Sequence, residues 1–323
     1  MAAFQFFLLF LLYPLARAAS RTSPPAGSIV VRQSGTQSGE FNTISKAIAS
    51  LSGTSARSIF IYPGTYREQV VIRYGGPLTV YGSTTDTVNW KSNTVTIPNN
   101  LNAQDNGGND TSGTLRALSN DFKLYNVNVA NTYGAGKQAG AVSARGTRQG
   151  YYGCRFTGYQ DTLFADANNG YQCYSNCLIE GAVDYIYGHA SAWFGECTIS
   201  SVGGGAITAN SRETTADTGY YVFDHSTIQG ASGTSLKGKV YLGRPWRVLA
   251  RVVYQNSALS DVVHADGWTT MAAGATPSFH EFANSGAGAS TSVRKNGCSS
   301  ISAAINKNAV VGSDWGKWVD KTY

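Results

Sequence analysis

The segments Tyr152-Gly-Cys-Arg-Phe156 and Ser175-Asn-Cys-Leu-Ile179 decide the fold, because they repeat one pattern 23 residues apart. Four further segments repeat it: Tyr125-Asn-Val-Asn-Val129, Gly195-Glu-Cys-Thr-Ile199, Asp224-His-Ser-Thr-Ile228 and Gln255-Asn-Ser-Ala-Leu259. The third residues of the six segments are 27, 23, 20, 29 and 31 positions apart. Each segment reads as a short alternating strand, and Gly, Asn, Ser and Thr fill the intervals.

Repeats of this length predict a solenoid, in which each coil buries its apolar face against the next. A β-sandwich also has short strands between turns, but the small residue that recurs at the third position favours stacked coils. We therefore expect an all-β chain with a single domain, residues 20–323, folded as a right-handed parallel β-helix. The amphipathic stretch 41–51 is expected to form a short helix that caps the N-terminal end, where an open sheet edge invites association. The pattern predicts no position for the tail 315–323.

The N-terminus carries an export signal. An apolar run from residue 4 to residue 15 precedes Ala16-Arg17-Ala18, a small-x-small cleavage pattern, so residues 1–19 are predicted to be a signal peptide. A membrane anchor is the alternative, but a bilayer span needs about 20 apolar residues. We expect a secreted, extracellular protein without a membrane segment. Asn109-Asp110-Thr111 is an acceptor sequon, which predicts a glycan on Asn109.

The charge of the chain indicates an anionic partner. The net charge is +6 and the isoelectric point about 9.0. Lys and Arg are scattered singly, and no finger or helix-turn-helix spacing occurs, so we expect no nucleic-acid binding. An acidic polysaccharide fits an exported protein better.

The cysteines occupy repeated positions. Cys154, Cys177 and Cys197 are each the third residue of a segment, so they are expected to stack at about 4.8 Å on successive coils. The Cβ separation in a parallel ladder is longer than a disulfide prefers, and we favour a ladder of buried thiols. Cys173 and Cys298 could pair or stay free.

Two aspartates share one offset from this ladder. Asp161 lies seven residues after Cys154, and Asp184 lies seven residues after Cys177, so both should sit on one face of adjacent coils. Two close carboxylates cannot both ionise cheaply, and one tends to keep its proton. The pair therefore supplies an acid beside a nucleophile or base. A solvated or calcium-bound pair is the alternative.

The sequence around this pair resembles the pectin methylesterase (pectinesterase) family, in its microbial, fungal-like type without the plant pro-region. The resemblance runs in order along the chain from about residue 28. It rests on Gly64-Thr-Tyr-Arg-Glu68, Gln138, Tyr159-Gln-Asp-Thr-Leu163, Val183-Asp-Tyr-Ile-Tyr-Gly188, Leu242-Gly-Arg-Pro-Trp246 and Asp266-Gly-Trp268.

The resemblance implies hydrolysis of the C6 methyl esters of polygalacturonan. Asp184 would be the nucleophile that forms an acyl-enzyme, and Asp161 the general acid and base. Gln138 and Gln160 would donate to the oxyanion. Arg244 would hydrogen-bond the nucleophile.

Further residues take structural or binding roles from the same resemblance. Trp246 and Tyr159 would line the sugar groove, whereas Tyr185 and Tyr187 could equally be core residues or substrate contacts. The expected partner is methyl-esterified pectin, and the protein is expected to be a monomer. No cofactor and no metal are expected, because neither a ligand cluster nor a phosphate loop is present.

Three positions depart from the family pattern. His189 stands where many members have Asn, the QDTL motif continues to Asp166 where a histidine is common, and two tyrosines replace phenylalanines at 185 and 187. Among rival functions, a polygalacturonase or a lyase of the same fold is disfavoured, because the chain lacks the sequence motifs expected of these enzymes. A binding solenoid without chemistry would be expected to lose Asp161, Asp184 or Arg244. An esterase acting on another ester stays open.

Overall fold

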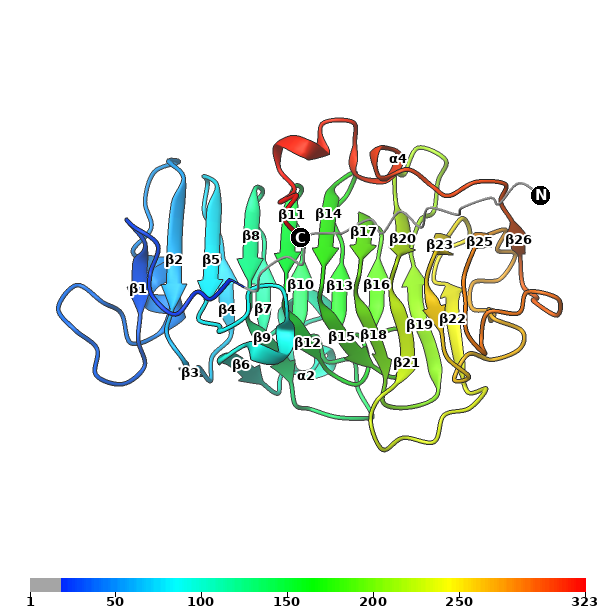
Figure 1. Cartoon of the computed structure of the whole chain (residues 1–323), viewed down its shortest axis with the longest axis horizontal. Coiled ribbons are helices and arrows are strands. Elements are labelled where there is room, and N and C mark those ends of the chain that lie inside the picture. Colours follow the sequence, from blue (N-terminus) through cyan, green and yellow to red (C-terminus); the bar gives the residue numbers. More distant parts are fainter. Residues whose placement is uncertain (1–18) are drawn as a thin grey trace, which may run out of the picture.

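The structure, a computed structural model, describes residues 19–323. Within these residues the chain winds as a parallel β-helix whose strands stack into three sheets of 11, 7 and 8 strands along the long axis (Figure 1). The structure confirms the all-β architecture. The predicted signal peptide, residues 1–19, lies almost entirely outside the described residues.

Each coil contributes strands to the three sheets in turn. The 11-stranded sheet contains β1 (Ile29–Val31), β2 (Arg57–Ile61), β5 (Leu78–Gly82), β8 (Phe122–Tyr125), β11 (Gln149–Tyr152), β14 (Tyr171–Ser175), β17 (Ser191–Gly195), β20 (Tyr220–Asp224), β23 (Arg251–Gln255), β25 (Ser278–Phe282) and β26 (Cys298–Ser300). The 8-stranded sheet contains β3 (Gly64–Thr65), β6 (Val95–Asn99), β9 (Asn128–Asn131), β12 (Arg155–Thr157), β15 (Leu178–Gly181), β18 (Thr198–Ser201), β21 (Thr227–Gly230) and β24 (Ala258–Leu259). The 7-stranded sheet contains β4 (Val70–Ile72), β7 (Leu115–Ala117), β10 (Val142–Ala144), β13 (Leu163–Ala165), β16 (Ile186–Gly188), β19 (Gly205–Asn210) and β22 (Val240–Pro245).

Helices are short and lie outside the coils. They are α1 (Ile44–Ala49), α2 (Ala103–Asn106), α3 (Asn109–Ser112) and α4 (Lys307–Val311), with 3₁₀ turns η1 (Trp90–Ser92) and η2 (Trp315–Lys317). No helix among residues 19–323 has the length and apolar character needed to cross a bilayer.

The register of the coils follows the sequence repeat. The paired residues are Val129 with Phe156, Phe156 with Ile179, Ile179 with Ile199, Ile199 with Ile228 and Ile228 with Leu259. These pairs reproduce the predicted spacings of 27, 23, 20, 29 and 31 residues. The apolar residue two places after the small one therefore stacks on its equivalents along the core.

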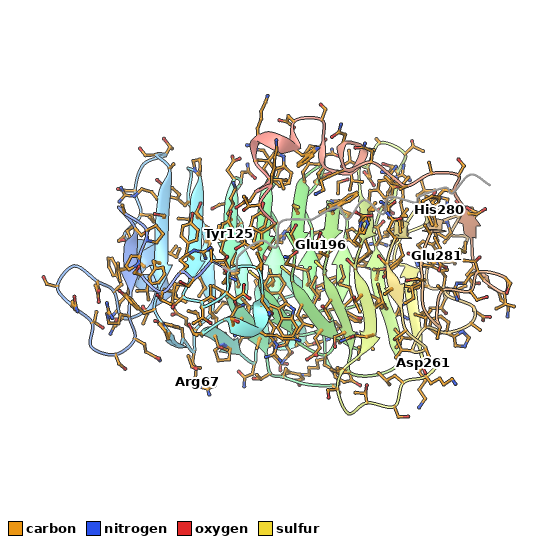
Figure 2. All side chains as sticks on the ribbon, viewed as in Figure 1. Arg67, Tyr125, Glu196, Asp261, His280 and Glu281 are labelled. Carbon is orange, nitrogen blue, oxygen red and sulfur yellow. The ribbon has the colours of Figure 1, made fainter. Side chains whose placement is uncertain are left out.

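The repeated segments are not single strands, contrary to our expectation. Each spans a bend: the 11-stranded sheet ends at the first residue, and the 8-stranded sheet begins soon after the third. The second residues have φ between 50° and 57°: Asn126, Gly153, Asn176, Glu196, His225 and Asn256. Gly and Asn adopt this left-handed conformation most readily, which explains their recurrence. Glu196 occupies its bend with an exposed side chain (Figure 2).

In the interior, side chains at equivalent positions of successive coils stack on one another. Five rings form one ladder with centroid separations of 4.4 to 4.8 Å: Tyr151, Tyr174, Phe194, Phe223 and Tyr254. Their planes lie within 9° of parallel. Such a ladder fixes the vertical order of the coils, because each ring must lie over its neighbour.

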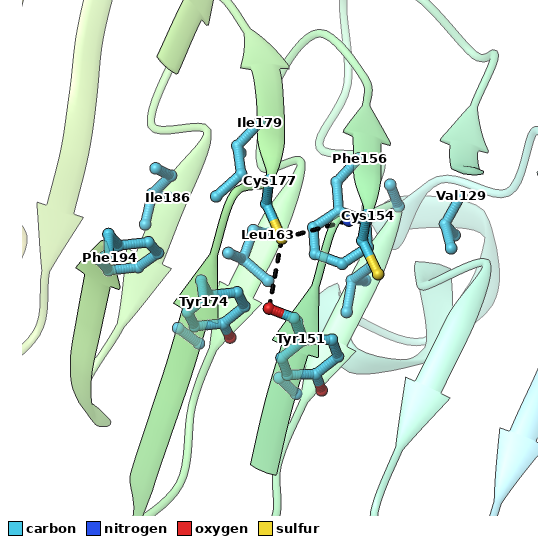
Figure 3. Packing of buried hydrophobic residues seen from close by; sticks show 14 of the residues in the cluster. Val129, Tyr151, Cys154, Phe156, Leu163, Tyr174, Cys177, Ile179, Ile186 and Phe194 are labelled. Atoms are coloured by element: carbon cyan, nitrogen blue, oxygen red, sulfur yellow. Dashed lines mark hydrogen bonds between the residues drawn. The ribbon is translucent and has the colours of Figure 1, made fainter. Parts of the chain in front are cut away.

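The cysteine ladder lies beside the rings. The amide of Cys154 donates to Sγ of Cys177 at 3.4 Å (Figure 3). All five cysteines of the chain lie in the described part, and each is a free thiol. The preferred prediction of a buried thiol ladder is confirmed, and Cys173 and Cys298 do not pair.

The N-terminal helix forms within the predicted stretch and is shorter than predicted. The side chain of Thr43 accepts a hydrogen bond from the amide of Lys46 and begins α1, whose Ile44 and Ala47 are buried. The carboxylate of Glu68 accepts hydrogen bonds from the backbone amides of Ile44 and Ser45, at 2.9 and 2.8 Å. Glu68, part of a family motif, thus has a structural role at the cap.

The C-terminal tail, for which the sequence predicted no position, runs back along the outside of the 11-stranded sheet (Figure 1). Val310, Val311, Trp318 and Val319 form a second apolar cluster with Cys173, Trp193, Tyr220, Val222 and Val253 of that sheet. Asp320 accepts from the Tyr125 hydroxyl, and its amide donates to Tyr152, each at 2.9 Å. The tail therefore covers an apolar sheet face that would otherwise be exposed.

Candidate active site

The site is built on the turns that lead from the 8-stranded to the 7-stranded sheet. Gln160 pairs with Val183 of the next coil, and the amide of Asp161 donates to the carbonyl of Val183 at 3.1 Å. One coil earlier, the amide of Ala139 donates to the carbonyl of Gln160 at 3.1 Å. Asp161 and Asp184 are therefore equivalent residues on adjacent coils, as their equal offset predicted.

Both aspartates adopt the left-handed backbone conformation. The φ angle is 66° at Asp161 and 48° at Asp184. Aspartate tolerates this conformation better than most residues, because its short polar side chain can bond locally. Each of these two residues is only 6% exposed.

Arg244 binds the second aspartate with two parallel hydrogen bonds. Its Nε and Nη2 donate to Oδ1 and Oδ2 of Asp184 at 2.8 and 2.6 Å. Arg244 reaches across β19, where its register partner is Ala209, which in turn pairs with Tyr187. The small side chain of Ala209 leaves room for the guanidinium. A bidentate ion pair of this kind is stronger and more directional than a single neutral hydrogen bond.

Asp161 has a different environment. Burial and the neighbouring charge of Asp184 raise the pKa of the Asp161 carboxyl well above its usual range, and Arg244 only partly offsets this. Among residues 19–323 its one side-chain hydrogen bond comes from Nδ2 of Asn109, at 3.3 Å from Oδ2. One carboxylate is thus held by a guanidinium, and the environment of its neighbour favours the protonated form.

The two glutamines lie on consecutive coils beside the aspartates. Oε1 of Gln138 accepts a hydrogen bond from Nε2 of Gln104, so the Nε2 of Gln138 is left to donate elsewhere. Gln138 and Gln160 both line the cavity that contains Asp161 and Asp184. The cavity has a volume of about 100 Å³.

Aromatic and apolar residues complete this cavity. Trp246, Tyr187, Ala209 and Met271 line it together with Asn109. Tyr187 is 2% exposed and stacks on Phe164 at 4.5 Å, and its hydroxyl has no hydrogen-bond partner among residues 19–323. Tyr185 instead lies in the core, where its hydroxyl bonds Ser201 at 2.9 Å. The two tyrosines that the sequence left undecided thus divide between cavity wall and core.

Tyr159 and Asn109 differ in their relation to the cavity. Tyr159 does not line it, and its hydroxyl lies near Gly203; its contact with a sugar chain stays a prediction. Asn109 lines the cavity and donates to Asp161 from the same Nδ2 atom that a glycan would occupy. This geometry disfavours Asn109 as a glycan acceptor.

The sequence did not predict that Asn109 and Met271 would line the cavity. Asn109 belongs to the excursion that carries α2 and α3, outside the repeat. Asp110 anchors α3, because its carboxylate binds Arg116 at 2.5 Å and Ser143 at 2.7 Å. The order of the family motifs gave no signal for either cavity residue. Residues 19–323 contain no cluster of three or more His, Cys, Asp or Glu side chains that could hold a metal ion.

Comparison with known proteins agrees with this geometry. Residues 28–311 match the Pectinesterase family model. The chain is 56% identical to pectinesterase A of Emericella nidulans over 308 residues, which is 95% of this chain and 93% of the relative. The crystal structure of the pectin methylesterase from Aspergillus niger, in deglycosylated form, superposes with a TM-score of 0.91 at 53% identity, covering 94% of this chain and 100% of that one.

A plant enzyme is also similar. Pectin methylesterase from carrot superposes with a TM-score of 0.82 at 28% identity, over 91% of this chain and 97% of that one. The family match spans most of the chain, and the fungal relatives cover it almost completely. The chain belongs to the pectinesterase family, in its fungal type, and is a carboxylic ester hydrolase.

Proposed function

We propose that this protein hydrolyses the C6 methyl esters of pectin to free carboxylates and methanol, with Asp184 as nucleophile and Asp161 as general acid and base. The observation that carries the proposal is the pair itself: Arg244 holds the carboxylate of Asp184, and on the preceding coil burial and the charge of Asp184 raise the pKa of Asp161, which favours its protonated form. Hydrolysis of an ester through an acyl-enzyme requires a nucleophile that attacks the carbonyl carbon and an acid that protonates the departing alkoxide.

The first half-reaction forms a covalent intermediate. An oxygen of Asp184 attacks the ester carbonyl carbon, and the carbonyl oxygen becomes an oxyanion. The amide groups of Gln138 and Gln160 line the same cavity and donate to this oxyanion, a contribution of roughly 3 to 4 kcal/mol per donor. The C–O bond to the methoxy group then breaks as Asp161 gives its proton to that oxygen, and methanol leaves an acyl anhydride on Asp184.

The second half-reaction regenerates the enzyme. Asp161, now ionised, accepts a proton from water as the water oxygen attacks the acyl carbon. The bond to Asp184 breaks, Asp184 returns to Arg244 as a carboxylate, and the galacturonate product carries a free carboxyl group. The protonated Asp161 is ready for another ester.

The cavity walls suit a sugar ring beside an ester. Trp246 presents a half-buried indole to the cavity, and flat rings pack against the apolar faces of pyranose units. Export through the predicted signal peptide, residues 1–19, would bring the enzyme to its polymeric substrate outside the cell. Extracellular activity and a mature N-terminus near residue 20 would support this part of the proposal.

Product analysis on highly methylated pectin tests the reaction class. We expect methanol and titratable acid in equal amounts, with no new reducing ends. A depolymerase of the same fold would instead produce reducing ends without methanol. Absence of methanol release from a correctly folded protein would refute the proposed function.

A further inference from the structure

A second hollow adjoins the catalytic cavity. It has a volume of about 370 Å³ and shares Trp246 with the catalytic cavity. Phe164 lines the second hollow and stacks at 4.5 Å on Tyr187, which lines the first. The two spaces therefore lie side by side over the outer face of the 7-stranded sheet. We call the second one the charged pocket, because Asp166, His189, Glu213, Asp217 and Arg247 line it.

Two departures from the family pattern meet in the charged pocket. Asp166 follows β13 and His189 follows β16, at the same offset from the register pair Phe164 and Tyr187. Nδ1 of His189 lies 2.5 Å from Oδ1 of Asp166. Many family members carry a histidine at position 166 and an asparagine at position 189. This chain has Asp166 and His189 there, and the two side chains pair across adjacent coils. His189 is 28% exposed and Asp166 10%, so the pair forms part of the pocket wall.

Several charged groups lie near His189 in and around the pocket wall. Arg145 of the preceding coils lies 3.6 Å from Asp166. The segment 211–219 brings Glu213 and Asp217 to the wall, and Arg247 lies beyond β22. In the same segment Arg212 bonds the carbonyls of Asp217 and Leu249. The wall of the pocket therefore carries three carboxylates and one arginine, and His189 is its only group that titrates near neutrality.

We propose that the charged pocket holds the galacturonate unit next to the one being de-esterified, and that protonation of His189 sets how strongly the pocket prefers an esterified neighbour. This inference rests on the proposed function. A methyl-esterified unit is neutral, whereas a free galacturonate is an anion at neutral pH. When His189 loses its proton, the wall gains one unit of negative charge and repels the anion.

The direction of the effect follows from the pair. Asp166 raises the pKa of His189 above its usual value, against a smaller opposing effect of burial and of Arg145. The pocket thus repels a free carboxylate less below this pKa and prefers an esterified neighbour more strongly above it. One charge at contact distance in water changes an affinity by about fivefold at most, and salt weakens the effect.

Competing substrates measure this selection directly. We would measure kcat/KM for methanol release, per ester group, with fully methylated galacturonate oligomers and with oligomers of equal length that base has randomly de-esterified. The ratio of the two values removes effects of the catalytic aspartates, because these act on both substrates alike. At low ionic strength we expect the ratio to rise with pH, by up to about fivefold.

Substitutions of His189 test whether this residue causes the rise of the kcat/KM ratio with pH. In His189→Asn the ratio should be high at every pH, because the side chain cannot become positive. His189→Gln should behave in the same way, which guards against a folding defect in one variant. His225→Asn is the matched control: His225 pairs with Asp224 at 2.9 Å and is 63% exposed on a different bend, and this variant should keep the rise.

Each outcome separates the two proposals. A flat ratio in the wild type, or a rise that persists in both His189 variants, would overturn the selector role while methanol release continues. Loss of methanol release in the wild type would instead overturn the proposed function. A His189 variant that unfolds at lower temperature and still shows the rise would assign the pair a structural role only.

Discussion

Arg244 donates from Nε and Nη2 to both carboxylate oxygens of Asp184, at 2.8 and 2.6 Å, across the strand that carries Ala209. Asp161, the neighbour of Asp184 on the preceding coil, has no guanidinium partner among residues 19–323, and burial together with the charge of Asp184 raises the pKa of its carboxyl. The difference between two stacked and otherwise equivalent aspartates therefore comes from a third coil. The predictions below test how far this arrangement determines the activity.

Replacing Arg244 by Lys should remove the bidentate contact and leave the positive charge. Lysine cannot form two parallel bonds to one carboxylate, so we expect kcat to fall by about 100-fold, the effect of losing roughly 3 kcal/mol of transition-state stabilisation. The rate of methanol release measures this. Arg32→Lys is the matched control, since Arg32 binds Glu40 in the same bidentate manner at 2.7 and 2.9 Å, far from the cavity. Equal effects of the two substitutions would contradict the account.

Replacing Asp161 by Asn should stabilise the fold at neutral pH and abolish most of the activity. The folded protein keeps the Asp161 proton above the unfolded value of 3.8, so it binds more protons than the unfolded chain. The stability of the wild type therefore falls as pH rises from 3.8 to the folded pKa, by about 1.4 kcal/mol per pH unit. The variant lacks this loss. Urea unfolding at several pH values measures the difference, and a constant difference would argue against a protonated Asp161.

Replacing Tyr187 by Phe should separate stability from activity. The hydroxyl is buried and has no partner within residues 19–323, so its removal is expected to raise the free energy of unfolding by about 1 kcal/mol. If the hydroxyl donates to substrate, KM should rise at the same time with little change in kcat. Tyr185→Phe is the control, because it breaks a bond to Ser201 in the core and should destabilise without affecting KM. A Tyr187→Phe enzyme with unchanged KM would restrict this hydroxyl to packing.

Asn109 should act through its side chain rather than through a glycan. Asn109→Ala removes the hydrogen bond to Asp161 and is expected to lower kcat by about tenfold, the effect of one such bond. Thr111→Ala destroys the sequon and leaves Asn109 in place, so it should retain full activity. Equal losses in both variants, together with a glycan detected on Asn109 by mass spectrometry, would show the opposite.

The repeat predicted the fold because one physical requirement recurs on every coil. Cys154, Cys177 and Cys197 mark the position after three of the left-handed bends, and the apolar residue two places later fills the core. Once these positions are aligned, the offset of seven residues places Asp161 over Asp184. The register of the core residues on successive coils therefore also predicts the relative position of the two site aspartates.

Features outside the repeat could not be predicted in this way. Asn109 comes from the excursion between β6 and β7, and Met271 from the loop between β24 and β25, so no coil position specifies them. The C-terminal tail covers Cys173 and Trp193 through Val310 and Trp318, residues too sparse to form a pattern. Tyr159 was assigned by its place beside a motif; its hydroxyl lies near Gly203, and its contact with a sugar chain stays a prediction.

The role of Asp184 is tested most directly by single-turnover methanol release with Asp184→Asn. An amide cannot displace methanol, so we expect the rate on highly methylated pectin to fall by at least 1,000-fold, in line with the loss of a catalytic nucleophile, while circular dichroism stays that of the wild type. A folded Asp184→Asn enzyme that releases methanol within about tenfold of the wild-type rate would contradict the assignment of Asp184 as nucleophile.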